Sequence, residues 1–182
     1  MFKVFSTEWI CYFFNIAKVV ALKSKDPSTK VGCVLVNEDK QIVSTGYNGF
    51  PKRMNDTIDR YINRPFKLTH VCHAEANAVC QAASTGCTAK DTVAFITLQP
   101  CMECAKLLIQ AGVVEIHFLI NEEYNKRREE QLKNSGTSVL ENWRDAKDAV
   151  MDMLKECGVR VVCHYETEHS TIPVDIYKTK IL

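Results

Sequence analysis

The sequence has no excess of charge of either sign, because 23 lysines and arginines stand against 22 aspartates and glutamates among its 182 residues. A dedicated nucleic-acid-binding protein usually shows a basic excess or a basic stripe. The balance therefore weighs against nucleic acid as a partner, while leaving room for a local pocket for one phosphate group. Apolar residues make up 46% and charged residues 25%, which is the composition of a globular protein rather than a disordered one.

The chain also lacks internal repeats, low-complexity stretches and any linker rich in Gly, Ser or Pro, and it contains only 7 glycines and 5 prolines. Its 182 residues are the length of one ordinary domain. We therefore expect a single domain over residues 1–182 with one hydrophobic core.

An uninterrupted apolar run is missing as well. The run from Val4 to Leu22 contains Glu8 and Lys18, and its apolar residues recur at helical spacing. This favours a core-facing helix, with Ser6 or Thr7 as N-cap, over a signal peptide or a membrane span. Without an export signal we expect a cytoplasmic protein with no membrane partner, whose cysteines are reduced thiols and metal ligands.

Apolar periodicity and turn residues predict alternating helices and strands. Helices are expected over 74–84, 100–111 and 142–157, and strands over 31–37, 41–47, 93–98, 114–120 and 159–165. Residues 48–70 are expected to form a long loop, and 122–134 a solvated helix or an irregular segment. This order implies an α/β fold, in which one mixed five-stranded sheet has helices on both faces. The tail after residue 166 is not placed.

Two short segments carry residues suited to metal chemistry, His73-Ala74-Glu75 and Pro100-Cys101-Met102-Glu103-Cys104. Cysteines three positions apart at a helix start place both sulfurs on one face of the first turn, where the helix dipole favours thiolates. Two thiolates and one imidazole suit zinc. Three protein ligands leave the fourth tetrahedral position for water, which is the arrangement of a catalytic zinc site.

Glu75 lies two positions beyond His73, so their side chains point about 200° apart on a regular helix. Both approach one metal only if it lies off the helix N-terminus. A carboxylate held near the zinc-bound water without ligating the metal is placed to shuttle protons. We therefore expect His73, Cys101 and Cys104 to hold one zinc ion and Glu75 to act as general base and acid.

Each segment alone has simpler interpretations. A Cys-x-x-Cys pair can hold structural zinc or consist of two buried thiols, and His-x-Glu alone indicates little. Structural zinc would need a fourth ligand, and the nearest candidate, Cys72, is adjacent to His73 and would point elsewhere. Together, in this order and each opening a predicted helix, the two segments are typical of zinc nucleobase deaminases.

The sequence resembles the deoxycytidylate (dCMP) deaminase family of the cytidine deaminase superfamily from about residue 16 to about residue 160. The matching stretches are Ser24–Gly32 (SKDPSTKVG), Gly46–Pro51 (GYNGFP), His73–Ala78 (HAEANA), Pro100–Lys106 (PCMECAK) and Gln110–Val113 (QAGV). The resemblance implies the three-layer α-β-α cytidine deaminase-like fold. It also implies zinc-dependent hydrolysis of dCMP to dUMP and ammonia, which would supply dUMP for thymidylate synthesis.

The resemblance further implies substrate-binding residues. Asn48 would contact the sugar or base through an amide that both donates and accepts hydrogen bonds, although Asn-Gly alone is a common turn. Ser28, Thr29 and Lys30 would lie near the phosphate, unless they form an ordinary polar loop. Tyr124 would lie near the nucleotide.

Members of this family are commonly hexamers that dCTP activates and dTTP inhibits. The resemblance therefore implies a homo-oligomer, with a hexamer favoured. The segment from Asn48 to Asn55, including Gly49, would belong to the allosteric region. Lys52 and Arg53 would contact a triphosphate effector, which Mg²⁺ could accompany, or would be solvated surface charges.

Departures from the family pattern are Cys33, where alanine is usual, and Gln99, where the superfamily often has glutamate. Some phage members bind a second zinc through extra Cys and His residues before the catalytic His. Residues 50–70 contain no Cys and only His70, so we expect one zinc per chain. The remaining cysteines are expected to be buried or free thiols: Cys11, Cys33, Cys80, Cys87, Cys157 and Cys163.

Three other functions fit part of the pattern. A tRNA adenosine deaminase would share the zinc and the glutamate but should show a basic face for RNA. A free cytidine deaminase usually has Cys where this chain has His73. A silent nucleotide-binding subunit would not need Glu75 beside a complete ligand set. The favoured partner is a small nucleotide.

Overall fold

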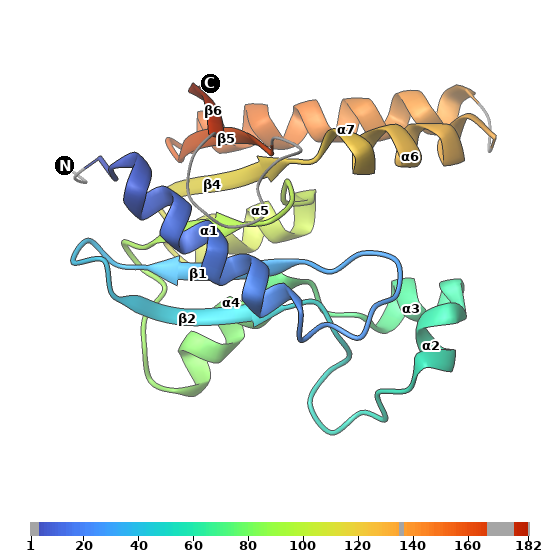
Figure 1. The fold of residues 1–182 in the computed structure, drawn as a ribbon, viewed down its shortest axis with the longest axis horizontal. Helices are drawn as coiled ribbons and strands as arrows, with labels where there is room; N and C mark the ends of the chain where they lie inside the picture. Colours follow the sequence, from blue (N-terminus) through green and yellow to red (C-terminus); the bar gives the residue numbers. More distant parts are fainter. Residues whose placement is uncertain (1–3, 135–136, 167–176, 182) are drawn as a thin grey trace.

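The computed structural model describes residues 4–134, 137–166 and 177–181. One sheet runs through the molecule in the strand order β2-β1-β3-β4-β5-β6 (Figure 1). The strands are β1 (Gly32–Val36), β2 (Ile42–Tyr47), β3 (Val93–Ile96), β4 (Glu115–Ile120), β5 (Arg160–Glu166) and β6 (Tyr177–Ile181). Strands β3, β4 and β5 are parallel, and the other pairings are antiparallel, so the predicted mixed sheet is confirmed.

The sheet has six strands rather than the five expected. All five expected strands are present, and β6 adds to the outer edge of β5 in an antiparallel register, with Val162 opposite Ile181. β6 comes from the tail that the sequence pattern did not place. A strand that pairs on one side only depends on the neighbouring strand with which it forms hydrogen bonds. A segment as short as β6 shows no distinctive periodicity in the sequence.

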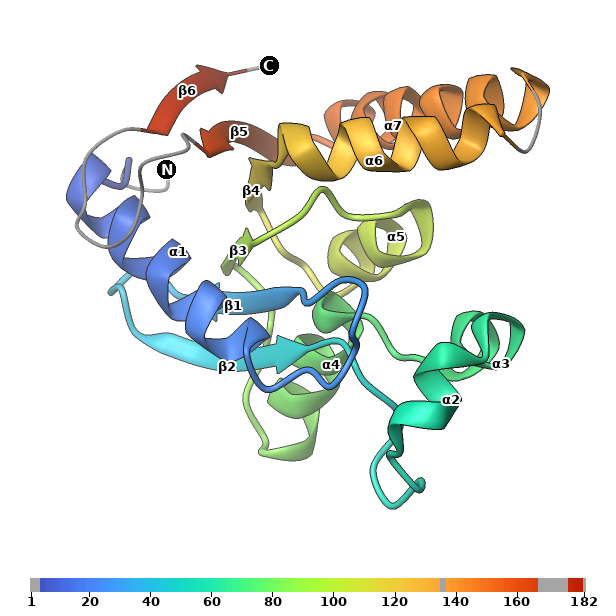
Figure 2. The same cartoon turned by 45° about the vertical axis from the view of Figure 1, so that its right-hand side comes forward.

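Helices cover both faces of the sheet, which confirms the three-layer arrangement (Figure 2). The helices are α1 (Thr7–Ala21), α2 (Ile58–Ile62), α3 (Arg64–His70), α4 (Ala74–Ser84), α5 (Met102–Gln110), α6 (Glu122–Lys133) and α7 (Thr137–Glu156). Helix α1 packs on one face, and α4, α5 and α7 pack on the other. Within the described residues, no helix is both long and apolar enough to cross a membrane.

The alternation of side chains along β1 explains these two layers. Cys33 and Leu35 belong to the core on the side of α4 and α5, whereas Val34 and Val36 belong to the core beneath α1. All four side chains are fully buried. A strand that is apolar throughout is typical of a sheet covered on both faces.

The expected loop over 48–70 is wrong in part, because it contains the short helices α2 and α3. The side chain of Asn63 accepts a hydrogen bond from the backbone N–H of Phe66 and so caps α3. Few apolar residues are needed here, since Tyr61 is the buried residue of α2 and α3 has none. Helices of five and seven residues are too short to show a helical period in the sequence.

The charged segment after β4 forms a helix, α6, which decides between the two expectations for residues 122–134. The Asn121 side chain caps it by accepting from the backbone N–H of Tyr124. Helix α7 begins at Thr137, earlier than the expected residue 142. All nine cysteines are free thiols, in line with the expectation.

Helix α4 lies unusually close to strand β2, and Gly46 permits this approach. A Cβ atom at position 46 would collide with the backbone carbonyl oxygen of Ala74 and the backbone nitrogen of Ala78. Ser44, two residues earlier on the same face, donates a hydrogen bond to the carbonyl oxygen of Ala78 over 2.8 Å. The first turn of α4, which follows His73, is therefore held directly against the sheet.

A chain of polar side chains, all buried except the partly exposed Arg160, lies on the α1 side of β4 and β5. Arg160 Nη1 lies 3.3 Å from Glu115 Oε2, and Glu115 Oε1 lies 2.6 Å from His117 Nε2. His117 Nδ1 is 2.9 Å from Nε2 of His164, whose ring meets that of Phe14 edge-on. These contacts satisfy groups that would otherwise be costly to bury.

We expect His164 to make the protein less stable in mild acid. Burial, with a further contribution from His117, lowers the pKa of His164 to about 3. An unfolded histidine has a pKa of about 6.5, so below that pH only the unfolded state takes up this proton. Each further pH unit of acidification then lowers the free energy of unfolding by about 1.4 kcal/mol. When the pH falls from 7 to 5, the free energy of unfolding, measured by urea denaturation, should decrease by about 2 kcal/mol more for the wild type than for His164→Gln. Equal losses would contradict this assignment.

Candidate active site

Three potential metal ligands meet where two helices begin. Their ligand atoms, His73 Nδ1, Cys101 Sγ and Cys104 Sγ, all lie within 4.8 Å of one another. His73 Nδ1 is 3.4 Å from each sulfur. His73 is the N-cap of α4 and Cys101 is the N-cap of α5, so the site lies off two helix N-termini. This is the position that the spacing of the sequence motifs requires.

The donor set of this cluster fits zinc. Hydrogen bonding from Cys104, with help from His73, lowers the pKa of Cys101 and so favours its thiolate form. The same contact and burial raise the pKa of Cys104. A bound cation would favour the thiolate form of both sulfurs, and an imidazole nitrogen lies beside them. Thiolate and imidazole ligands together are the set that zinc takes in proteins.

Glu75 lies in the first turn of α4 and is buried, with 4% of its surface exposed. Burial raises the pKa of its carboxyl group, and the neighbouring His73 opposes this rise. A carboxyl group with a raised pKa gives up and takes back a proton closer to neutral pH, as general acid–base catalysis requires. Glu75 also lines the cavity described next.

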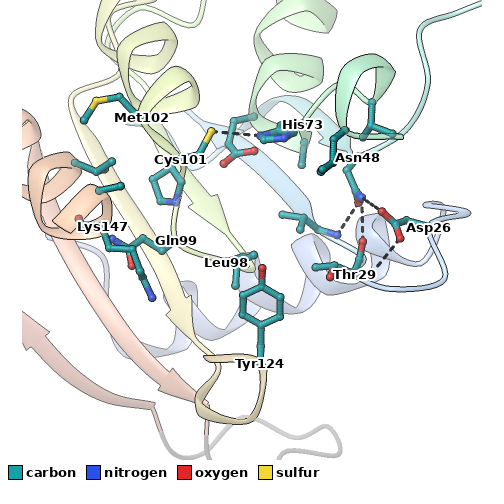
Figure 3. Close-up of a pocket in the computed structure, with 18 of the residues that line it drawn as sticks. Asp26, Thr29, Asn48, His73, Leu98, Gln99, Cys101, Met102, Tyr124 and Lys147 are labelled. Atoms are coloured by element: carbon teal, nitrogen blue, oxygen red, sulfur yellow. Dashed lines mark hydrogen bonds between the residues drawn. The ribbon is translucent and has the colours of Figure 1, made fainter. Parts of the chain in front are cut away.

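A cavity of about 350 Å³ opens beside the cluster, within the range of small-molecule binding sites. Figure 3 shows its two sides. Asp26, Thr29 and Asn48 lie on one side, and Gln99 and Lys147 lie on the other, with Tyr124 at the end away from His73 and Cys101.

Asn48 and Asp26 hold the loop before β1 in place. Asn48 Oδ1 accepts a hydrogen bond from the backbone N–H of Val31 over 2.8 Å, and its Nδ2 donates to the carbonyl oxygen of Thr29 over 2.9 Å. Asp26 lies 3.4 Å from the same Nδ2, and its carboxylate is contacted by Lys67 Nζ at 2.7 and 2.8 Å. Asn48 therefore shapes the cavity wall with both atoms of its amide.

Replacing Asn48 with aspartate should lower the free energy of unfolding by about 3 kcal/mol. The new carboxylate could still accept from Val31 but would face two acceptors, the Thr29 carbonyl and the Asp26 carboxylate, without a proton to donate. Urea denaturation measures the change. The exposed Asn142→Asp on α7 is the matched control and should change little. Similar stabilities for both variants would contradict the role given to this amide.

The other residues expected to bind nucleotides are divided between the cavity and the surface. Thr29 and Tyr124 line the cavity, whereas Ser28 and Lys30 are exposed residues outside its lining. In the region assigned to effectors, Gly49 is buried and exchanges backbone hydrogen bonds with Cys72. Lys52 and Arg53 are exposed on the turn that follows and are not part of the cavity lining.

Several cavity residues were missed by sequence reasoning. Asp26 stands in a stretch that matches the family, and its carboxylate accepts hydrogen bonds from the backbone N–H groups of Ser28 and Thr29. An aspartate two residues before a Ser-Thr pair was the available signal for this turn. Lys67 carried no signal, because it lies in a segment interpreted as a loop. Lys147 carried none either, since a single lysine on a charged helix normally faces solvent. Only the packing of α7 places it in the cavity lining.

Comparison with known proteins agrees with this geometry. The family model described as the cytidine and deoxycytidylate deaminase zinc-binding region matches residues 7–120. A probable deoxycytidylate deaminase of Caenorhabditis elegans is 46% identical over 112 residues, covering 60% of this chain and 56% of that protein. The chain thus spans little more than half the length of this relative. An uncharacterized deaminase in the luxG 3′ region of Aliivibrio fischeri is 31% identical over 174 residues, covering 94% of this chain and 99% of that protein.

A solved structure shares the fold. The dCMP deaminase of the cyanophage S-TIM5, in its apo form, matches with a TM-score of 0.62 at 23% identity, over 86% of this chain and 98% of that one. The same phage protein has also been solved in complex with dCMP and dUMP. The matched family region contains the three ligands and Glu75. The chain therefore belongs to the family defined by the cytidine and deoxycytidylate deaminase zinc-binding region.

Proposed function

We propose that this protein is a zinc-dependent deaminase that hydrolyses dCMP to dUMP and ammonia. The observation that carries the proposal is the buried Glu75, which lines a cavity beside the His73, Cys101 and Cys104 cluster. Zinc held by these three residues would supply Lewis acidity that makes water nucleophilic near neutral pH. The Caenorhabditis elegans relative, named as a probable deoxycytidylate deaminase, supports dCMP as the substrate.

Glu75 moves the protons in the proposed reaction. It takes one from the attacking water as the carbon–oxygen bond forms at the ring carbon that bears the amino group. It delivers this proton to the neighbouring ring nitrogen. It then takes the proton of the newly formed hydroxyl group and passes it to the departing amine. The carbon–nitrogen bond breaks, ammonia leaves, and the keto form of the uracil ring remains. No oxidant or reductant is needed, since water supplies the atoms that replace the amine.

The substrate is tested by incubating the zinc-loaded protein separately with dCMP, dCTP, cytidine and an adenosine-containing tRNA, and measuring ammonia release. We expect dCMP to show the highest kcat/KM. Turnover of the tRNA without turnover of any mononucleotide would refute the proposal and favour RNA editing. Turnover of cytidine equal to that of dCMP would refute the role of the phosphate while keeping the chemistry.

We further propose that the enzyme is a cytoplasmic homo-oligomer, with a hexamer favoured, that supplies dUMP for thymidylate synthesis. In this proposal dCTP, with Mg²⁺, activates it and dTTP inhibits it through the region around Gly49, Lys52 and Arg53. Both cations are exposed and available to a triphosphate. Initial rates with each effector, for the wild type and for the double variant Lys52→Met/Arg53→Met, test the regulation. Effector responses unchanged by the double variant would contradict this assignment.

A further inference from the structure

One side of the cavity comes from beyond the matched family region. The family model ends at residue 120. Tyr124 and Asn125 of α6, and Ala146, Lys147 and Val150 of α7, all line the cavity. We call this surface the α6–α7 wall. It contributes groups to the cavity that the shared zinc-binding region does not contain.

Lys147 is the cation of the α6–α7 wall, and neighbouring side chains hold it in place. Its Nζ donates a hydrogen bond to Asn125 Oδ1 over 3.1 Å. Its backbone carbonyl accepts one from Gln99 Nε2 over 3.3 Å, which ties this turn of α7 to the segment preceding Cys101. Arg144 and Glu129, 3.0 Å apart, join α7 to α6 one turn away. Lys147 is half-buried rather than extended into solvent.

The charges on the two sides of the cavity differ. Opposite the α6–α7 wall, Lys67 is neutralised by Asp26, which contacts it through both carboxylate oxygens. Lys147 has Glu129 and Asp148 as acidic neighbours, which raise its pKa, although burial lowers it more. Glu129 is itself paired with Arg144.

A phosphate is therefore better matched by the α6–α7 wall. Against the opposite side it would have to compete with the Asp26 carboxylate for Lys67. At Lys147 it would gain a charge-assisted hydrogen bond from a partly desolvated ammonium group, and such bonds are stronger than neutral ones. The exposed Ser28 and Lys30 offer a weaker, solvent-screened alternative.

We propose that Lys147, oriented by Asn125, binds the phosphate of the nucleotide and makes this site select a nucleoside monophosphate over the free nucleoside. The identity of the base rests on the proposed function, whereas the position of the phosphate rests on the wall formed by α6 and α7.

The test compares dCMP with deoxycytidine, which lacks the phosphate, in the wild type and in four variants, Lys147→Met, Lys147→Arg, Lys155→Met and Lys30→Met. Lys147→Met should lower kcat/KM for dCMP by about 10- to 100-fold, mainly through KM, and leave deoxycytidine turnover unchanged. Lys147→Arg should restore most of the loss. Lys155→Met removes an exposed lysine from the same helix outside the cavity lining and should behave as the wild type.

Three results would overturn the proposal. The first is that Lys147→Met leaves dCMP turnover unchanged. The second is that it reduces the turnover of dCMP and of deoxycytidine equally, as loss of a structural role would. The third is that Lys30→Met shows the selective loss of dCMP turnover instead. Calorimetric binding of dUMP and deoxyuridine to the zinc-loaded proteins supplies a readout independent of turnover. If the wild type releases no ammonia from dCMP, the proposed function fails, while weaker dUMP binding by Lys147→Met alone would still support the phosphate site.

Discussion

Replacing Glu75 with glutamine should lower dCMP turnover by about 10³-fold while bound zinc stays at the wild-type level. Glutamine keeps the size and the hydrogen-bonding oxygen of the side chain but cannot accept and release a proton. Glu75 lines the cavity without belonging to the ligand cluster, so we expect its charge to be needed for proton transfer rather than for metal retention. Ammonia release and zinc content, measured on the same sample, check both halves of the expectation.

Glu103→Gln is the matched control, because it makes the same chemical change between the two cysteines. The Glu103 side chain is 80% exposed and pairs with Lys106 at the surface. We expect near-wild-type turnover and zinc content from this variant. A Glu75→Gln protein that keeps its activity would show that another group carries the protons, and one that loses zinc would show that Glu75 is a ligand.

Replacing Cys101 with alanine should remove both zinc binding and turnover. The variant loses one of the three ligand atoms of the cluster, leaving a two-residue site. A ligand present at 1,000 times its dissociation constant stabilises the native state by about 4 kcal/mol. For a protein of this length that corresponds to roughly 10 °C in Tm. Thermal melts with and without added zinc should show this rise in the wild type and not in Cys101→Ala.

Cys157→Ala provides the control for a lost thiol, since Cys157 is exposed just after α7 and distant from the ligand cluster in the sequence. Its zinc content and the zinc-dependent rise in Tm should match those of the wild type. Full zinc content in Cys101→Ala after dialysis against a chelator would contradict the ligand set.

The metal cluster could be predicted from the sequence because its geometry is local. Each of its two segments needs only a helix start, and the N-cap positions of His73 and Cys101 confirm that requirement. The residues around the substrate are different. The Asp26–Lys67 pair joins residues 41 positions apart, and Lys147 reaches the cavity only through the packing of α7. No spacing rule connects such residues, so their meeting depends on tertiary packing.

The same distinction applies to the fold. Strands β1 and β3 are buried throughout, and their continuous apolar runs predict them clearly. Strand β6 gains its partner from the edge of β5, and the helices α2 and α3 bury little apolar surface. Elements that depend on a neighbouring edge or on a single cap leave a weak pattern in the sequence.

In the proposed function, one zinc ion held by His73, Cys101 and Cys104 supports hydrolysis of dCMP. Titrating zinc into the metal-free protein while following dUMP formation tests it most directly. Activity should rise in proportion to bound zinc and reach its plateau at one zinc per chain. A metal-free protein with full activity, or a fully loaded protein that forms no dUMP, would contradict it.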